Sequence, residues 1–573
     1  MSQSSVGRRR CERVSFVGAL VLACGVSSSA LAQDLESAVN AFWTAGSSDE
    51  IDETVEAILE LKPEIEPLWT HLRHGATYGA GVPRGRRLLT RANADGVEHR
   101  YLLYVPEDYD PARRYPVRVY LHGGVNRPRR ADGDWWRNNE RYARADSLVV
   151  FPESWIDSVW WESSQVENLT GMLNDIKRRY NVNENAVYML GISDGGSAAY
   201  YHAFKAPTPW AAFLPFNGHP VVLANPATDV EGQMYVTNLR NRPFFVINGG
   251  QDRLYPVDSV VPFLRLFVAA GIVIDFRPQP EAGHDMRWWA DESPNIDEFI
   301  QTQARRPLPD RLVWETESTE RFNRAHWVVI TALGSVDGES NFDDFNEITP
   351  PAPSVPIGFN MLGELDTAAG IQLIDIVPGS LAEVAGVRPG DILVEVNGMA
   401  VATVDDLRAA IQAPRDAPEM PLRIQREGES MTFVLSPPDT VQAPPSRQAF
   451  PHPEPSGRVQ LARNGNEIAV ATRGVRRYTL LLSPEQFDFT QPFRVTTNDM
   501  LSFEGMVEPS PETLLRWAAR DRDRTMLFGA ELEIEVRVRC RGLPESSEVG
   551  REKSGGSRRA SPRDMTRSCG AAA

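Results

Sequence analysis

Between Tyr101 and Arg306, short apolar runs rich in β-forming residues alternate with helical segments. The runs are "YLLYVP", "PVRVYLHGG", "SLVVFPES", "AVYMLGIS", "AAFLPFN", "PFFVING" and "VIDFRPQP". Strands separated by helical crossovers pair in parallel, because each crossover returns the chain to the same end of the sheet. The pattern therefore predicts an α/β domain with a doubly wound, mostly parallel sheet covered by helices.

The stretch "GISDGGSAAYYHAF" begins at Gly191, directly after the apolar run "AVYML". It places Ser193 in a Gly-x-Ser-x-Gly pattern between a predicted strand and a small-residue helix. A sharp turn of this kind holds a hydroxyl at the carboxyl edge of a sheet, and Gly191 and Gly195 avoid β-carbons that would crowd it. The pattern alone also occurs in ordinary turns, so its place between strand and helix is what favours a nucleophile.

A serine nucleophile needs a base and an acid that orients the base. In this fold class they follow the serine in the order acid, then histidine. The run "FFVINGGQDRLYP" places Asp252 after a strand, and "VIDFRPQPEAGHDM" places His284 after the last strand. The two later histidines fall in a strand of another domain (His326) and in a linker (His452). We therefore expect Ser193, Asp252 and His284 to meet; the alternative is that the latter two only cap a helix and a loop.

Negative charge on a substrate oxygen requires fixed hydrogen-bond donors. The loop "HGG" in "VRVYLHGGVNRP" follows an early strand, and we expect Gly123 and Gly124 to leave their N–H groups free. The amide of Asp194, next to the nucleophile, is the third expected donor. His122 is expected to shape this loop rather than to titrate.

Tryptophan is concentrated in or beside predicted loops at the carboxyl edge of the sheet. Core packing would scatter it more evenly, so we expect an aromatic wall around a substrate pocket. Packing between loops is the alternative. The expected pocket residues are Trp135, Trp136, Trp155, Trp160, Trp161 and Trp288, with Trp289 beside them.

Residues 98 to 300 resemble the α/β-hydrolase catalytic domain, in the branch shared by prolyl oligopeptidase-like peptidases and polyhydroxybutyrate depolymerase-like or feruloyl-type esterases. The resemblance rests on "YLLYVPEDYDPARRYPVRVYLHGG", "GISDGG", "GGQDRLYP" and "AGH". It implies Ser193 as nucleophile, His284 as general base and acid, and Asp252 as the orienting carboxylate. True prolyl oligopeptidases carry a gating β-propeller, whereas a short helical segment precedes this domain, so gating by peptide size is not expected. Without metal-ligand spacing or a nucleotide-binding fingerprint, no cofactor and no metal are expected.

The "VPGSLAEVAGVRPGDILVEVNG" stretch combines a Pro-Gly turn, a one-turn helix, a Gly-Asp turn, a strand and an Asn-Gly hairpin turn. It resembles a bacterial PDZ domain. Such domains bind a peptide C-terminus as an added strand. By position, Gly358 and Phe359 match the loop that holds the peptide carboxylate, and a helix over 404–413 would form the other wall of the groove. The alternative is a spacer that binds no free peptide.

The rest of the chain divides by composition. The expected segments are a signal peptide (1–32), an N-terminal helical segment (33–80), the α/β domain (81–306), a discontinuous β domain (307–340 and 457–540), the PDZ module (355–437), a Pro-rich linker (438–456) and a disordered tail (541–573). The β domain is predicted as discontinuous because the two strands before the insert would be marginal alone.

The N-terminus predicts export. A basic stretch, an apolar run and Ala30-Leu31-Ala32 before Gln33 form a secretory signal that is too short to span a membrane. We expect a secreted or periplasmic bacterial envelope protein without an integral membrane segment. Lipoprotein anchoring through Cys24 is the alternative, although the bulky Leu22 disfavours it. Of the four cysteines, Cys540 and Cys569 could pair after signal removal, so no disulfide scaffold is expected.

The charge balance, 60 basic against 77 acidic residues or −17, makes nucleic acid and anionic membranes unlikely partners. The sequence therefore predicts a serine hydrolase that cleaves peptide or ester acyl bonds through an acyl-enzyme, with a PDZ module that binds peptides or partners. A carboxylesterase or depolymerase acting on polyester or feruloyl-type esters is the nearest rival. A non-catalytic PDZ scaffold is the rival from another class.

Overall fold

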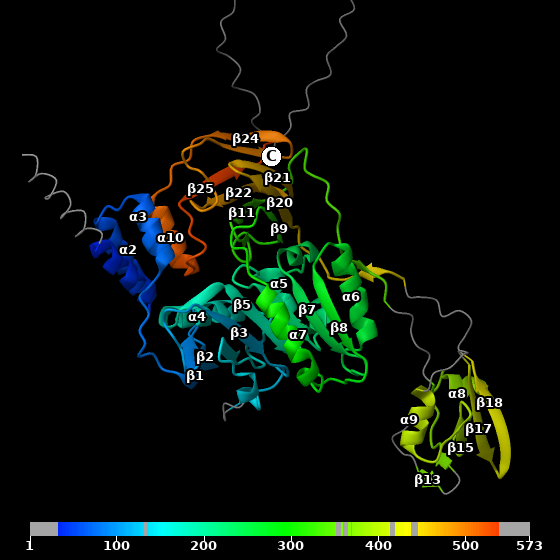
Figure 1. Ribbon diagram of the computed structural model, residues 1–573. Helices are drawn as coiled ribbons and strands as arrows, with labels where there is room; N and C mark the ends of the chain where they lie inside the picture. The colour runs from blue at the N-terminus through cyan, green and yellow to red at the C-terminus, as the bar shows by residue number, and fades with distance from the viewer. Residues whose placement is uncertain are drawn as a thin grey trace, which may run out of the picture. The chain divides into compact units, whose positions relative to one another are not determined.

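The computed structural model describes residues 33–130, 135–350, 357–358, 365–367, 370–412, 419–436 and 445–537 (Figure 1). The predicted signal peptide, Cys24, Phe359, Cys540, Cys569 and the predicted tail lie outside the described residues.

An eight-stranded sheet forms the α/β domain, in the order β1-β2-β4-β3-β5-β6-β7-β8. Strands β3 to β8 run parallel, whereas β1 and β2 add an antiparallel edge. The predicted doubly wound, mostly parallel sheet is confirmed, with β1 as an additional strand. The bounds are β1 (Gly85–Ala92), β2 (Glu98–Val105), β3 (Tyr115–Leu121), β4 (Leu148–Pro152), β5 (Val182–Ile192), β6 (Ala212–Phe216), β7 (Phe244–Gly249) and β8 (Ile274–Gln279).

Helices cover both faces of this sheet because its strands are apolar on both sides. Leu103 and Val119 face one core, which α4 (Ser163–Arg179), α5 (Asp194–Lys205) and α6 (Val257–Ala269) complete. Their chain neighbours Leu102 and Tyr120 face a second core under α7 (Trp289–Thr302). The period-two alternation of buried side chains thus fixes which helix covers which face.

Two further sheets form the β domain around one core. They run β10-β11-β22-β25 and β24-β23-β21-β20-β9. Strands before the PDZ insert pair with strands after it: β9 with β20 and β11 with β22. The bounds are β9 (Arg311–Thr316), β10 (Arg324–Ala325), β11 (Val328–Leu333), β20 (Gly457–Asn464), β21 (Glu467–Arg473), β22 (Val475–Leu482), β23 (Phe493–Thr497), β24 (Met500–Gly505) and β25 (Ala530–Glu535).

A two-residue ribbon closes the base of the insert, because β12 (Glu347–Ile348) pairs antiparallel with β19 (Arg447–Gln448). Phe450, just after β19, packs its ring edge-on against Phe204 and Phe263 of the α/β domain, with ring centroids 5.2 and 5.7 Å apart. The ribbon brings the two ends of the insert together, and Phe450 attaches this base to a rigid core.

The PDZ module has its own sheet and core. Gly386, with φ +89°, ends α8, and Asn397 and Gly398, both with positive φ, make the predicted hairpin turn between β15 and β16. The helix end and the hairpin turn that the sequence predicted are thus present, with the left-handed backbone typical of such positions. The bounds are β13 (Leu365–Thr367), β14 (Gly370–Gln372), α8 (Leu381–Ala385), β15 (Ile392–Val396), β16 (Met399–Ala400), α9 (Val404–Gln412), β17 (Met420–Arg426) and β18 (Glu429–Leu435).

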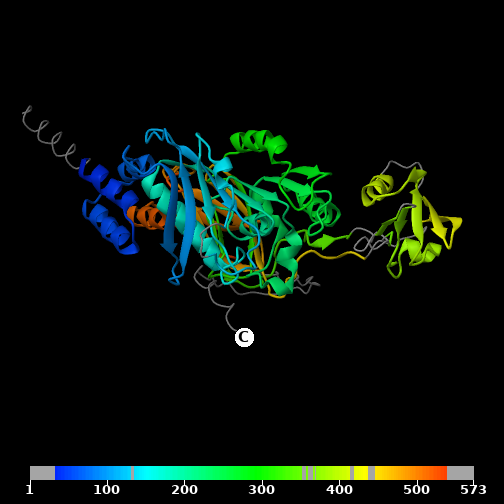
Figure 2. The ribbon, with the colours of Figure 1, turned by 90° about the horizontal axis from the view of Figure 1, so that it is seen from below.

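Three N-terminal helices, over residues 33–44, α2 (Ser48–Glu60) and α3 (Ile65–His74), pack with α10 (Pro511–Asp521) from the other end of the chain (Figure 1 and Figure 2). Their shared core includes Phe42, Leu68 and Leu515. The predicted N-terminal helices are present, but α10 was not predicted, because the β-strand runs around it dominate that part of the sequence.

The segment 521–525, "DRDRT", ties these parts together through buried charges. Arg522 donates to the carbonyls of Phe42 and Trp43 at 2.8 and 2.7 Å. Asp523 pairs with Arg305 at 2.7 Å, where the chain leaves the α/β domain. Arg524 binds both carboxylate oxygens of Glu184, at 2.5 and 3.0 Å. One short loop of the β domain thus contacts both the N-terminal helices and the α/β domain.

We expect Arg524→Ala to destabilise the protein strongly. The side chains of Arg524 and Glu184 are 4 and 3 % exposed, so the substitution leaves a carboxylate buried without its partner, at a cost of about 3 to 5 kcal/mol. Urea unfolding would measure the loss. Arg494→Ala, which breaks an exposed pair with Glu504, is the matched control and should cost about 1 kcal/mol or less. Equal losses in the two variants would contradict the role of the buried pair.

Candidate active site

Ser193 lies at the tip of a tight turn between β5 and α5, with φ +58° and ψ −121°. Glycine is required on both sides of this turn. A β-carbon on Gly191 would lie 2.0 Å from the carbonyl oxygen of Gly195, and one on Gly195 would lie 2.0 Å from that of Leu121. The turn therefore presses against the end of β3 and presents the Ser193 hydroxyl at the carboxyl edge of the sheet.

The structure brings the three predicted side chains together. His284 Nε2 lies 2.8 Å from Ser193 Oγ, and His284 Nδ1 lies 2.7 Å from Asp252 Oδ2. The second oxygen of Asp252 accepts the N–H groups of Leu254 and Tyr255 at 2.8 and 2.9 Å. Since the Asp252 side chain is fully buried, these bonds fix the carboxylate that orients the imidazole.

The carboxylate of Asp194 folds back onto the loop after β3. Its Oδ2 accepts the N–H groups of Gly124 and Val125 at 2.8 and 3.0 Å. The prediction that the Gly124 N–H is free is therefore wrong, because this group donates to the Asp194 carboxylate. Spacing along the sequence does not show such a contact. Asp194 thus has a second role, holding this loop, that the sequence did not reveal.

Two N–H groups remain for a substrate oxygen. In the described structure no acceptor is recorded for the amides of Gly123 and Asp194. A β-carbon on Gly123 would lie 2.6 Å from the β-carbon of Ser193 and 3.1 Å from its Oγ, so this residue lies directly against the nucleophile. Gly123 and Asp194 are therefore the two of the three predicted donors whose N–H groups stay available for an oxyanion.

His122 supports the same loop and does not face the reaction. Its Nδ1–H donates to the Gly123 carbonyl at 2.9 Å, and its Nε2 accepts the Ser154 N–H at 3.0 Å. Trp160 donates to the His122 carbonyl at 2.9 Å. Burial lowers the pKa of His122, so the ring stays neutral and keeps both bonds, as the sequence predicted.

The predicted tryptophan-lined pocket is wrong for the six named side chains. Each is at most 9 % exposed, and five of them belong to the two cores of the α/β domain. Trp155 packs its ring on His99 and lies under the guanidinium of Arg129. The alternative, packing beneath the loops, accounts for their position: loops at a sheet edge need large apolar side chains to anchor them.

Two further rings beside the triad were not predicted. Tyr255 lies edge-on to His284, with ring centroids 5.5 Å apart, and burial raises its pKa to about 12. His219 hydrogen-bonds Ser259, and burial lowers its pKa to about 4. At a pKa of about 12 the Tyr255 phenol stays protonated, and at a pKa of about 4 the His219 imidazole is a weak base, so neither competes with His284. The sequence signal that could have placed Tyr255 beside the triad is its position three residues after Asp252.

The loop that the sequence predicts to hold a peptide carboxylate is described in part. Gly358 has φ +100°, and its carbonyl accepts the N–H of Val377 at 2.9 Å. A β-carbon on Gly358 would lie 2.0 Å from Ser380 Oγ, so the backbone here requires glycine. Phe359 lies outside the described residues, and the predicted groove helix corresponds to α9.

No helix of the described residues is both long and apolar enough to cross a membrane. Likewise, across the described ranges no group of three or more histidine, cysteine or carboxylate side chains is placed to hold a metal ion.

Comparisons with known proteins found matches that each cover only part of the chain. Residues 374–426 match the family model described as a PDZ domain. A putative zinc metalloprotease of Rhizobium meliloti is 39% identical over 72 residues, which is 12% of this chain and 18% of the relative. A bifunctional acetylxylan esterase/xylanase of Neocallimastix patriciarum is 25% identical over 170 residues, 28% of this chain and 23% of the relative. The chain thus spans less than a quarter of the length of these relatives.

Solved structures with partial likeness include a thermostable esterase, 20% identical with a TM-score of 0.31, covering 38% of this chain and 63% of that chain. An acylaminoacyl peptidase is 16% identical with a TM-score of 0.33, covering 39% of this chain and 42% of that chain. The fold itself follows from the sheet order and the turn at Ser193. The chain therefore joins a domain of the α/β-hydrolase fold to a β domain that carries an inserted PDZ domain.

Proposed function

We propose that this protein is a serine hydrolase that cleaves ester or peptide acyl bonds through an acyl-enzyme. The observation that carries the proposal is the Ser193–His284–Asp252 arrangement, with contacts of 2.8 and 2.7 Å. A non-catalytic scaffold would have no need of the strained serine conformation beside two free amides, since such strain costs free energy.

The geometry supports the following sequence of steps. Ser193 Oγ attacks the acyl carbon while His284 Nε2 takes its proton, and the imidazolium is stabilised by Asp252. The N–H groups of Gly123 and Asp194 bind the oxyanion. The tetrahedral intermediate breaks the bond to the leaving group, which receives the proton from His284. Water, deprotonated by His284, then attacks the acyl-enzyme, and the bond to Ser193 Oγ breaks as His284 returns the proton to that oxygen, which releases the acid and free Ser193.

For the substrate, we propose an ester before a peptide, because the relative with the longest matched segment among those described is an acetylxylan esterase/xylanase. A peptide remains the second candidate, supported by the match to a PDZ-family model and by short matches to proteins named as proteases.

We further propose that the PDZ module binds the C-terminus of a peptide or partner, and that the basic stretch, apolar run and Ala-Leu-Ala site direct export. A panel of p-nitrophenyl esters and p-nitroanilides would separate the two substrate classes.

Ser193→Ala should abolish both turnover and labelling by a fluorophosphonate, because the probe reacts only with an activated serine hydroxyl. Labelling is read by mass spectrometry of the modified peptide, and circular dichroism checks that the variant folds. Ser197→Ala is the matched control, since that hydroxyl lies one helical turn further and contacts only His219 backbone groups. Labelling that persists in Ser193→Ala would refute the assignment.

Asp194→Ala should lower kcat by about 10²-fold or more while KM changes little. The substitution removes the acceptor that holds the loop presenting the Gly123 N–H, and loss of one oxyanion-hole donor lowers kcat by about that factor. Asp194→Asn retains an acceptor oxygen and should recover part of the rate. Steady-state kinetics on a small ester measure both. If the alanine variant keeps the wild-type kcat, the carboxylate does not position the loop.

Replacing residues 355–437 with a short Gly/Ser linker should leave the α/β and β domains folded, since the β12–β19 ribbon holds the ends of the insert together. If the PDZ module recruits substrates, kcat/KM for a small p-nitrophenyl ester should be unchanged, and activity on a macromolecular substrate should fall through lost effective concentration. Equal losses on both substrates would show a structural role instead, and no loss on either would show an idle spacer.

A further inference from the structure

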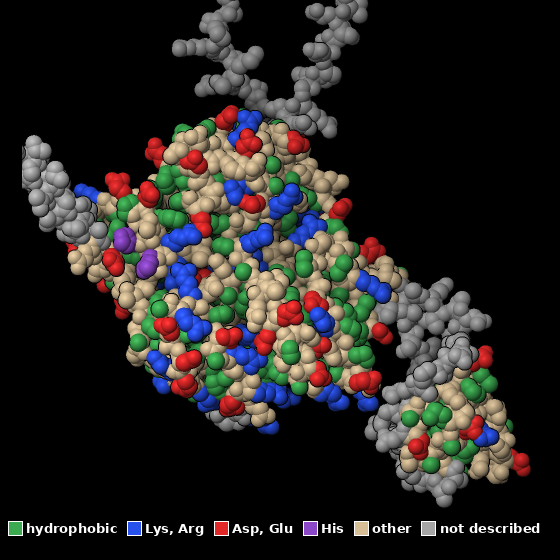
Figure 3. All heavy atoms as spheres, in the orientation of Figure 1, with side chains coloured by type: hydrophobic (Ala, Val, Ile, Leu, Met, Phe, Trp, Pro, Cys, Tyr) green, Lys and Arg blue, Asp and Glu red, His purple; other side chains and the backbone are tan. Residues whose placement is uncertain are grey.

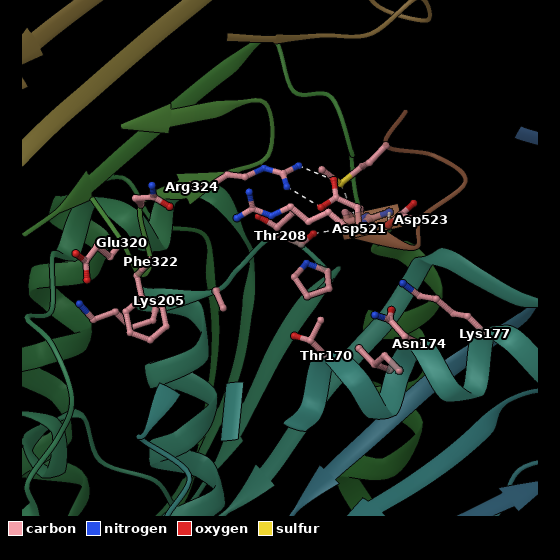
Figure 4. Close-up of a pocket in the computed structure, with 17 residues that line it drawn as sticks. Thr170, Asn174, Lys177, Lys205, Thr208, Glu320, Phe322, Arg324, Asp521 and Asp523 are labelled. Atoms are coloured by element: carbon pink, nitrogen blue, oxygen red, sulfur yellow. Dashed lines mark hydrogen bonds and ion pairs between the residues drawn. The ribbon is translucent and has the colours of Figure 1, made fainter. Parts of the chain in front are cut away.

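A cavity of about 280 Å³ lies between the α/β domain and the β domain, away from the triad (Figure 4). We call it the junction cavity. One wall is α4, which contributes Thr170, Asn174 and Lys177, and the other wall includes Arg324, Arg520 and Asp521. The spacing of four and three residues places the three α4 side chains on one face of the helix. No motif in the sequence indicated this site.

Most of the charges around the junction cavity are already neutralised. Arg305 pairs with Asp523 at 2.7 Å, and Arg324 binds both oxygens of Asp521 at 2.6 Å. Lys205 pairs with Glu317 at 3.0 Å. These three ion pairs contribute no net charge to the cavity, whereas the lining carboxylate of Glu320 has no cation within 4.0 Å in the described structure.

Two cations at the cavity have no such partner. The ammonium of Lys177 donates to the main-chain carbonyl of Arg522 at 3.2 Å, and among the described residues no carboxylate lies within 4.0 Å of it. Asp523 attracts it, but that carboxylate is bound to Arg305. The guanidinium of Arg520 lies over the ring of Trp517 and likewise has no carboxylate within 4.0 Å in the described structure. Burial lowers the pKa of Lys177, although Asp523, Glu184 and Asp521 attract its charge.

Neutral polar groups complete one wall. Asn174 has a buried Oδ1 with no hydrogen-bond partner, and it lies between Thr170 and Lys177 along α4 in Figure 4. Rotation of the Asn174 amide about its last side-chain bond exchanges the oxygen and the NH₂ group, so the NH₂ group can occupy the position of Oδ1. On the face drawn in Figure 3, Lys and Arg side chains gather between the β domain and the α/β domain, although the chain as a whole carries −17.

We propose that the junction cavity binds a small oxyanion, a carboxylate or a phosphate, through Lys177 and Arg520, with Asn174 as a neutral donor. Ammonium and guanidinium groups make their strongest hydrogen bonds to such anions. The volume lies near the lower end of small-molecule sites, so it suits a small metabolite rather than a polymer. Because both walls come from different domains, a bound anion would stabilise the junction between them.

The test measures the melting temperature of the full chain while phosphate, succinate or chloride is added at constant ionic strength. We expect the melting temperature to rise with phosphate or succinate beyond chloride, and the stronger of the two identifies the head group. Isothermal titration calorimetry with the same salts should give saturable binding. Lys177→Met should weaken that binding by about ten- to a hundredfold, the value of a charge-assisted hydrogen bond.

Arg179→Met is the matched control, because it removes one positive charge from the same helix at an exposed position outside the cavity. It should keep the anion-dependent shift. Without anion, Lys177→Met should melt at or above the wild-type temperature, since it removes a buried charge with no ion-pair partner. An anion effect equal to that of chloride, or equal shifts in Lys177→Met and wild type, would overturn the proposal.

Discussion

The structure depends on the close approach of backbone at Ser193. The Ser193 N–H donates to the Phe216 carbonyl at 2.9 Å, so the turn is bound to the end of β6. Gly195 brings α5 against the end of β3 with no room for a side chain. The positive φ of Ser193 is therefore held by three neighbouring strands, and any shift among them would move the hydroxyl away from His284. The site is accurate because the sheet under it is rigid.

The sequence predicted this part well because its signals are local. A strand followed by Gly-x-Ser-x-Gly, and polar residues directly after later strands, fix positions relative to the sheet edge without any knowledge of packing. Predictions failed where the answer depended on side-chain direction. The carboxylate of Asp194 takes the Gly124 amide, and the tryptophans turn inward to the cores. Neither direction is encoded in spacing along the chain.

Long-range charge pairing was equally hidden from the sequence. Arg524 and Glu184 are 340 positions apart, and no local pattern in "DRDRT" indicates which residues its charges pair with. In the structure the charges of Arg522, Asp523 and Arg524 are buried because each finds a partner or a set of carbonyls on another domain, which is the condition for burying charge at all. A discontinuous β domain needs such ties, since its strands must reassemble across an insertion that folds by itself.

Helix α5 connects the two sites physically. It begins with Asp194 at the triad and ends with Lys205 at the junction cavity, and its residues from Gly195 to Lys205 are buried. Its twelve residues span about 18 Å at 1.5 Å per residue. At that separation two unit charges interact by only about 1 kcal/mol at an effective dielectric constant of about 20. An anion in the junction cavity would therefore act on the triad mainly by holding α5 and the domains around it in place, so its effect belongs to stability more than to the chemistry of acyl transfer.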